Sequence, residues 1–137
     1  MTEKSFWTLL RNNLAIKMYR VENRVGSGMP DVHYINKRAS GWIELKYVDS
    51  FPKKGKVNIG LKKHQALWHK NYNAFGGVSW VLVRLSRSAI FLFKGEDADI
   101  IAKMPNKFFM MEKCVWCKRG NMGAKDWDNL KEEITNV

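Results

Sequence analysis

The chain of 137 residues lacks any apolar run long enough to cross a membrane, since a spanning helix needs about 20 such residues. Its first residues, Met-Thr-Glu-Lys-Ser-Phe-Trp, lack the apolar stretch of a signal peptide. Internal repeats and low-complexity segments are missing too, and no change of composition marks a domain boundary. We therefore expect one cytoplasmic domain, residues 1–137, with no membrane partner.

Cysteine is scarce. The two cysteines, Cys114 and Cys117, form a single Cys-x-x-Cys pair, and the nearest histidine, His69, lies far away in the sequence. A structural zinc site needs four ligands, and a redox pair needs a strand-to-helix context that this region does not show. We expect two reduced, partly buried thiols.

Acidic residues are outnumbered, with 13 Asp and Glu against 24 Lys and Arg, for a formal charge of +11. Such an excess on a small domain indicates a polyanionic partner, with nucleic acid as the default. Charge alone also suits anionic lipid or an acidic protein. The hydrophobic fraction of 45% is ordinary for a globular protein and argues against disorder.

Apolar periodicity predicts both helices and strands. The expected helices run from a Ser5 cap to about Met18, then over 61–73, 96–104 and 125–134. The expected strands cover 19–25, 32–35, 42–48, 78–85 and 89–93, and 105–123 reads as irregular. This order predicts an α/β fold in which a mixed sheet is flanked by helices.

Two of these strands place acids together. If Val32–Ile35 and Trp42–Val48 form a hairpin with a four-residue loop, Asp31 faces Glu44, and Lys46 shares the side of Glu44. Two carboxylates that close repel each other unless a cation lies between them, and Mg²⁺ typically takes one or two protein carboxylates. The pattern indicates metal-assisted hydrolysis of a phosphodiester, by water that the metal activates.

Neighbouring residues admit two interpretations each. Glu22 is either an ion-pair partner of Arg20 or Arg24, or a further metal carboxylate. Gln65, on the apolar stripe of the 61–73 helix, either packs its stem on the core or reaches the metal site or DNA. His33 and Trp42 share the face of Asp31 and Glu44. His33 either contacts the substrate or the metal, or is the commoner packed or exposed strand histidine, and we expect Trp42 in the core.

Basic residues gather next to the predicted site in sequence. Five lysines are our candidates for contact with the phosphate backbone: Lys53, Lys54, Lys56, Lys62 and Lys63. Lysine-rich loops are also often merely solvated.

The segments Glu22–Arg24, Gly28–Asp31 and Gly41–Lys46, followed by Gln65, resemble the PD-(D/E)xK nuclease superfamily. More narrowly, they resemble its phage-type VRR-NUC (virus-type replication-repair nuclease) group, related to Holliday-junction resolvases. The resemblance covers about residues 6–95 and leaves about 96–137 as a C-terminal helical extension. It implies a restriction-endonuclease-like core and a Mg²⁺- or Mn²⁺-dependent deoxyribonuclease.

The same resemblance implies roles for individual residues. Asp31, Glu44, the Leu45 carbonyl and Glu22 would bind the metal, while Lys46 and Gln65 would act beside them in catalysis. The implied substrate is branched DNA, a Holliday junction or a flap, in phage replication, repair or recombination. A homodimer in the host cytoplasm would suit paired cuts across a junction.

Two other classes of protein remain open at this point. A non-catalytic nucleic-acid-binding module would use basic residues and tryptophans for phosphate contacts and stacking, but it leaves the Asp31–Glu44 pair unexplained. A structural or interaction protein would use the apolar surface of Phe108–Met111 and Trp116.

Overall fold

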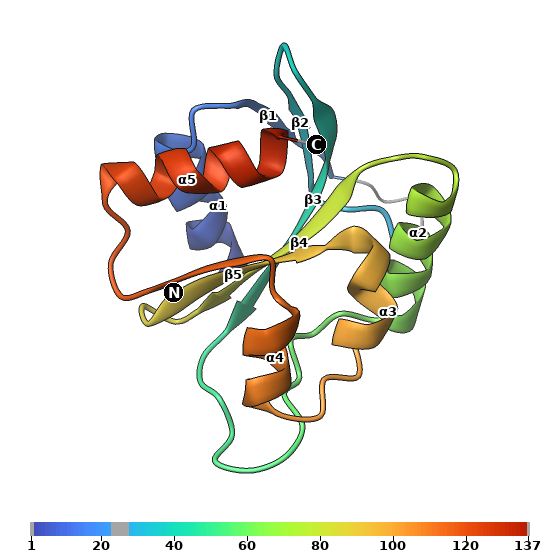
Figure 1. Cartoon of the computed structure of the whole chain (residues 1–137), viewed down its shortest axis with the longest axis vertical. Helices are drawn as coiled ribbons and strands as arrows, with labels where there is room; N and C mark the ends of the chain where they lie inside the picture. The colour runs from blue at the N-terminus through green and yellow to red at the C-terminus, as the bar shows by residue number, and fades with distance from the viewer. Residues whose placement is uncertain (1, 23–27, 137) are drawn as a thin grey trace.

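The computed structural model describes residues 2–22 and 28–136, which form one six-stranded sheet between two layers of helices (Figure 1). The strands lie in the sheet in chain order: β1 (Lys17–Arg20), β2 (Val32–Ile35), β3 (Ser40–Val48), β4 (Ser79–Leu85), β5 (Ala89–Lys94) and β6 (Trp116–Arg119). The helices are α1 (Glu3–Asn13), α2 (Lys63–Ala74), α3 (Ala98–Ile101), α4 (Lys107–Lys113) and α5 (Ala124–Thr135), with a 3₁₀ turn, η1 (Gly95–Asp97).

The sheet is mixed, as predicted. β3 and β4 run parallel, and every other neighbouring pair is antiparallel. The chain reaches β4 from β3 through α2, because parallel neighbours need a crossover rather than a tight turn. The predicted flanking helices are confirmed too.

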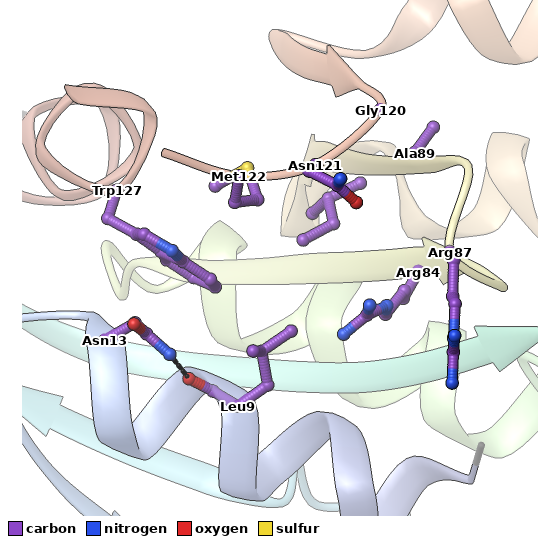
Figure 2. Close-up of a pocket in the computed structure, with 10 residues that line it drawn as sticks. Leu9, Asn13, Arg84, Arg87, Ala89, Gly120, Asn121, Met122 and Trp127 are labelled. Atoms are coloured by element: carbon purple, nitrogen blue, oxygen red, sulfur yellow. Dashed lines mark hydrogen bonds between the residues drawn. The ribbon is translucent and has the colours of Figure 1, made fainter. Parts of the chain in front are cut away.

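The two faces of the sheet have different covers. In Figure 1, α1 and α5 lie side by side on one face, while α2, α3 and α4 lie on the other. Strand alternation therefore sends Ile43 and Leu45 of β3 into the α1/α5 core and turns Glu44 and Lys46 toward α2. Near the β4–β5 turn, the α1/α5 side holds an open cavity (Figure 2).

The first helix starts and ends earlier than predicted. Thr2, rather than Ser5, is the N-cap: the Ser5 amide donates to Thr2 Oγ1 at 3.2 Å, and the Thr2 amide donates to Ser5 Oγ at 2.8 Å. The helix ends at Asn13, so Met18, expected as its last residue, lies in β1. Leu14 stays buried although it is the extended C-cap, which explains why the apolar stripe seemed to continue.

The expectation of an irregular segment at 105–123 is wrong. Asn106 caps α4, accepting a hydrogen bond from the Phe109 amide at 2.9 Å, and β6 pairs antiparallel with β5. Residues 96–137 thus add a strand to the sheet as well as helices. Met110 is fully buried in the core, so the apolar surface expected at Phe108–Met111 is interrupted.

The cysteines lie at this end of the chain. Both are free; Cys114 is half-buried as predicted, whereas Cys117 is exposed. Burial, and then the neighbouring Cys117, raise the pKa of Cys114 to about 11, so its thiol stays protonated near neutral pH.

The remaining predicted elements are present with shifted ends. The extended run expected at 19–25 is strand only as far as Arg20, and residues 23–27 lie outside the described part of the chain. The helix expected from Leu61 begins at Lys63. Among residues 2–22 and 28–136, no helix has the length and apolar character needed to cross a membrane.

Candidate active site

The hairpin of β2 and β3 has the predicted register. Ile35 pairs with Ser40 and Val32 with Ile43, so one further step places Asp31 opposite Glu44. Asp31 lies just before β2, where its carboxylate accepts a hydrogen bond from the Leu45 amide at 3.2 Å. The two acids therefore meet where β2 begins, at the point beyond which β3 continues without a β2 partner.

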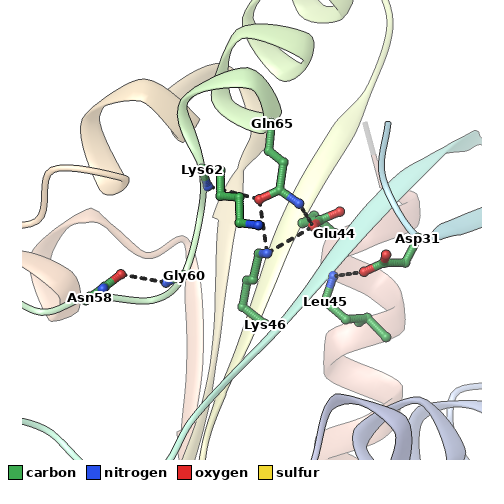
Figure 3. A network of polar contacts seen from close by, with 8 residues as sticks. All are labelled: Asp31, Glu44, Leu45, Lys46, Asn58, Gly60, Lys62 and Gln65. Carbon is green, nitrogen blue, oxygen red and sulfur yellow. Dashed lines mark hydrogen bonds and ion pairs between the residues drawn. The ribbon is translucent and has the colours of Figure 1, made fainter. Parts of the chain in front are cut away.

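A pocket of about 510 Å³ opens at this point. Its polar lining comes from three parts of the fold: Asp31 and the β3 pair Glu44 and Lys46, Gln65 at the start of α2, and Glu3 at the start of α1. Figure 3 shows the side chains of β3 and α2 pointing toward one another. The sequence-predicted residues Asp31, Glu44, Lys46 and Gln65 are thus brought together.

Gln65 connects the helix to the strand. Its amide nitrogen donates to Glu44 Oε1 at 2.9 Å, and its oxygen accepts from Lys46 Nζ at 3.1 Å and from the Lys62 amide at 2.9 Å (Figure 3). Of the two interpretations of Gln65, the amide that reaches the site is the one observed. Lys46 Nζ also forms an ion pair with Glu44 Oε1 at 3.3 Å.

Glu44 is buried with one oxygen unused. Its side chain is 2% exposed, and Oε2 has no hydrogen-bond partner among the described residues. Burial, and then the charge of Asp31, raise the pKa of Glu44 to about 8, although Lys46 acts in the opposite direction. Burial also raises the pKa of Asp31. A buried, acceptor-rich oxygen that lacks a donor indicates a site for a cation or a proton.

No protein-family model matches the chain, and no curated protein sequence matches it. Among solved structures, it is similar to Hjc, a Holliday junction resolvase from the archaeal hyperthermophile Archaeoglobus fulgidus. The TM-score is 0.55 and the sequence identity 18%, over 80% of this chain and 89% of that chain. The chain shares the fold of that protein. This is the restriction-endonuclease-like architecture predicted above, and at this identity the likeness shows the fold alone.

The donor set at this point suits a hard divalent cation. Among the described residues, Glu44 Oε2 has no hydrogen-bond partner, and Asp31 stands beside it. In an extended strand the carbonyl and amide of one residue lie on the same side, so the Leu45 carbonyl shares the side of the amide that meets Asp31. By register, the residue opposite Leu45 is Pro30, which has no N–H to donate to that carbonyl. Among the residues that the structure describes, no group of three or more His, Cys, Asp and Glu is spaced to hold a metal. Mg²⁺ nevertheless needs only one or two carboxylates, with carbonyls and waters completing its shell.

The acid that reaches the pocket from elsewhere is Glu3, not Glu22. Glu3 lies in the first turn of α1, and burial raises its pKa, while the charge of Lys46 lowers it. Glu22 is exposed beyond the end of β1 and does not line the pocket; its possible partner Arg24 lies outside the described residues. Starting the first helix at Ser5 left Glu3 out of the sequence prediction, whereas the Thr2–Ser5 capping pair would have included it.

A half-exposed aromatic row begins on the face of the sheet that carries Asp31 and Glu44, outside the lining of the pocket. The ring of His33 lies 4.9 Å from that of Trp42, which lies 6.1 Å from that of Trp68, and Trp68 stacks on Tyr72 at 4.6 Å. His33 is therefore packed, as expected. The prediction of Trp42 in the core is wrong: it is half-exposed. Its face of β3 also carries the polar residues of the site, and its ring contacts Trp68 of α2.

The structure separates the five candidate lysines. Lys62 lines the site pocket, and Lys63 is exposed in the first turn of α2. Lys53, Lys54 and Lys56 are exposed in the loop between β3 and α2, away from the pocket lining. This loop is anchored by the buried side chains of Val57, Ile59 and Leu61.

His69 is a buried polar residue beside the site that sequence reasoning missed. It is fully buried on α2, its Nδ1 lies 2.7 Å from Ser79 Oγ, and its Nε2 has no partner among the described residues. Burial, and then the charge of Lys46, lower the pKa of His69 to about 4, so the ring is neutral near pH 7. Asn73 also donates to Ser79 Oγ at 2.7 Å.

Proposed function

We propose that this protein is a metal-dependent DNA endonuclease that hydrolyses phosphodiester bonds. The observation that carries the proposal is the meeting of Asp31, Glu44, Lys46 and Gln65 in one pocket, with Glu44 Oε2 buried and unpartnered. The resolvase fold and the charge of +11 both agree with a polyanionic substrate at this site.

Each residue has a role that follows from its contacts. Asp31, Glu44 and the Leu45 carbonyl would hold Mg²⁺ or Mn²⁺, which when bound lowers the pKa of water and offsets charge on the phosphate. Lys46 keeps its ammonium beside the reacting phosphate, where it stabilises developing negative charge or orients the attacking water. Gln65 positions both Lys46 and Glu44 through its two hydrogen bonds.

For the substrate, we propose a branched DNA, a four-way junction first and a flap second. The archaeal structure with the same fold is described as a Holliday junction resolvase, and the sequence resemblance pointed to the same class. A role in phage replication, repair or recombination belongs to the same proposal. The exposed lysines Lys53, Lys54, Lys56, Lys62 and Lys63 would contact the phosphate backbone outside the scissile position.

Symmetric cutting of a four-way junction requires two active sites, and the described chain has one candidate pocket of this composition. We therefore include a homodimer in the proposal. Light scattering after size-exclusion chromatography measures it directly: a mass of about twice the 16.0 kDa chain supports it, and a monomer at working concentrations opposes it.

The deciding experiment is cleavage of linear, flap and four-way DNA of matched sequence, with Mg²⁺, Mn²⁺ or EDTA. Asp31→Asn removes one carboxylate charge from the pocket, while Asp49→Asn makes the same change at an exposed position beyond β3. We expect metal-dependent cleavage of branched DNA that Asp31→Asn abolishes and Asp49→Asn preserves. Equal cleavage by both variants would contradict the site.

A non-catalytic DNA-binding module is the second candidate. Acids on a DNA-binding face repel phosphate, which is why this module leaves the Asp31–Glu44 pair unexplained. The pKa of about 8 weakens that objection, because it favours a protonated, uncharged Glu44 at neutral pH. The half-exposed row of His33, Trp42, Trp68 and Tyr72 would then supply stacking surfaces. Tight binding of all DNA forms, with no cleavage under any metal condition, would favour this module over the nuclease.

A further inference from the structure

A second pocket, of about 210 Å³, lies on the α1/α5 side of the sheet (Figure 2). It is enclosed by the second half of α1, the β4–β5 turn, residues 120–122 and the start of α5. Its polar lining consists of two guanidinium groups, from Arg84 and Arg87, and two side-chain amides, from Asn13 and Asn121. No acidic residue lines it, so the pocket has two positive charges and no compensating carboxylate.

Arg84 is held in place by two contacts, and part of its guanidinium has no hydrogen-bond partner among the described residues. Its Nε donates to the Ser86 carbonyl at 2.7 Å, and its guanidinium carbon lies 5.9 Å from the centre of the Phe6 ring. One terminal nitrogen, Nη1, is buried and has no hydrogen-bond partner among the described residues. A buried charged donor without an acceptor is costly, and an arginine cannot relieve that cost by losing its proton.

Arg87 brings the second charge to the mouth of the pocket. It is exposed in the tight turn that follows β4, and in Figure 2 its side chain and that of Arg84 reach down toward α1. Neither guanidinium forms an ion pair with an acid in the described part of the chain. Two guanidiniums close together and free of carboxylates match the oxygens of a tetrahedral anion, because each can donate two parallel hydrogen bonds.

The pocket is close to the candidate active site along two elements. On α1, Glu3 lines the active-site pocket, whereas Leu9 and Asn13 line this one, a separation of about 9–15 Å along the helix axis. Across the sheet, Arg84 pairs in register with Tyr47, which lines the active-site pocket. The axial rise of one DNA strand is about 3.4 Å per phosphate, so two pockets at this separation lie within reach of phosphates a few nucleotides apart on one strand.

We propose that the pocket of Arg84 and Arg87 binds a phosphate group, and that in the DNA complex this is a backbone phosphate a few nucleotides from the scissile one. The second half of the proposal rests on the proposed function. The pocket fixes the position of the strand relative to the metal site, so the distance between the two pockets sets where the cut falls. Such contacts position DNA without reading its sequence.

The first test needs no DNA. Amide and arginine Nε resonances are followed by NMR as inorganic phosphate replaces chloride at constant ionic strength. We expect saturable shifts at Gly120, Asn121 and Arg84 that are lost in Arg87→Gln and in Arg84→Lys, which keeps the charge but loses the fork. Arg38→Gln, the same charge change on the exposed β2–β3 turn, should leave them intact. Absence of saturable shifts in a folded wild-type protein would overturn the pocket as a phosphate site.

The second test identifies the source of the phosphate. Junction DNA with one uncharged methylphosphonate at each successive position is bound by Asp31→Asn protein without divalent cations. We expect one position, a few nucleotides from the cut, where removing the charge weakens binding by protein with Arg87 intact but not by Arg87→Gln. The slope of log K against log salt should also fall by about 1 in Arg87→Gln.

These outcomes separate the two claims. Phosphate shifts without any such position would overturn the DNA backbone as the ligand and indicate a free phosphate-bearing molecule. Phosphate shifts and a sensitive position, in a protein that cleaves no DNA, would uphold the pocket while the nuclease function fails.

Discussion

Replacing Glu44 by glutamine should stabilise the metal-free protein at alkaline pH while removing its response to Mg²⁺. Glutamine keeps an oxygen for the hydrogen bonds from Gln65 and Lys46, and it mimics the protonated acid at the unpartnered position. It removes only the charge that the buried site disfavours. If Glu44 served the fold alone, its substitution would destabilise the protein. If Glu44 is a buried metal carboxylate, its substitution should stabilise the metal-free protein, because the unfavourable buried charge is gone.

The magnitude follows from the pKa of Glu44, which is about 8 when folded against an ordinary value of 4.5. Between these values the unfolded chain has released the proton and the folded protein retains it, so stability falls as pH rises. A gap of about 3.5 pKa units corresponds to about 5 kcal/mol in total. Above pH 8 the protein bears the whole of this loss of stability, and below pH 4.5 it bears none of it.

His69 opposes this trend at lower pH. Its pKa falls from 6.5 to about 4 on folding, so the unfolded chain binds the extra proton and stability rises with pH up to 6.5. The window from pH 6.5 to 8 therefore isolates Glu44, and there we expect wild-type stability to fall by about 2 kcal/mol.

The assay is urea unfolding in EDTA at several pH values across this window, repeated with saturating Mg²⁺. Wild-type protein should lose about 2 kcal/mol in EDTA, whereas Glu44→Gln should stay level. Mg²⁺ should stabilise wild-type protein, by about 2.7 kcal/mol at one hundred times the dissociation constant, and leave Glu44→Gln unchanged. Equal pH profiles for the two proteins would refute the reasoning about the buried carboxylate.

Three further substitutions test the site from other directions. Glu3→Gln should weaken Mg²⁺ binding by about 10–100-fold in calorimetry. The control Glu22→Gln, at an exposed position outside the pocket, should leave Mg²⁺ binding unchanged. The opposite ranking of the two variants would restore Glu22 to the site. Gln65→Ala should cost about 1–3 kcal/mol in urea unfolding and lower the cleavage rate about 10²-fold, since Lys46 loses its positioning partner; full activity would exclude that role. Gly28→Ala should destabilise by more than about 1–2 kcal/mol, because Gly28 has a φ of +81° and a Cβ there would collide with the backbone carbonyl of the first turn of α2; a neutral result would contradict that packing.

The centre of the site was predictable from local pattern. A hairpin loop of four residues, closed by two hydrogen bonds between Asn36 and Ala39, sets the register that brings Asp31 opposite Glu44. Period-two alternation then places Lys46 beside Glu44 without any knowledge of the rest of the fold. The mixed sheet followed in the same way, from tight turns between early strands and a helix before the central one.

Glu3 was missed for a different reason. Its position depends on how α1 packs on the sheet, and the end of a helix is the least certain part of any pattern. The helix that covers the site misled in another way: its buried residues are Ala66 and His69, whereas Trp68 and Tyr72 of the expected apolar stripe are half-exposed. Apolar periodicity assumes an apolar core, but this helix packs over polar residues of β3, so its buried face is partly polar.

The pocket of Arg84 and Arg87 could not be predicted from the sequence pattern either. Arg84 reads as the polar end of a strand, and only the return of residues 120–122 from the far end of the chain encloses it. The short elements α4 and β6 could not be predicted for a related reason, because seven and four residues are too few to show a period. In addition, β6 is stabilised by pairing with β5 rather than by its own strand propensity.

The most direct measurement of the central claim is the anomalous density of crystals grown with Mn²⁺. The account predicts a peak in the pocket, in contact with carboxylate oxygens of both Asp31 and Glu44 and with the Leu45 carbonyl. An anomalous peak elsewhere in the protein would contradict the account. So would the absence of a peak at Asp31 and Glu44 in a protein whose DNA cleavage Mn²⁺ supports.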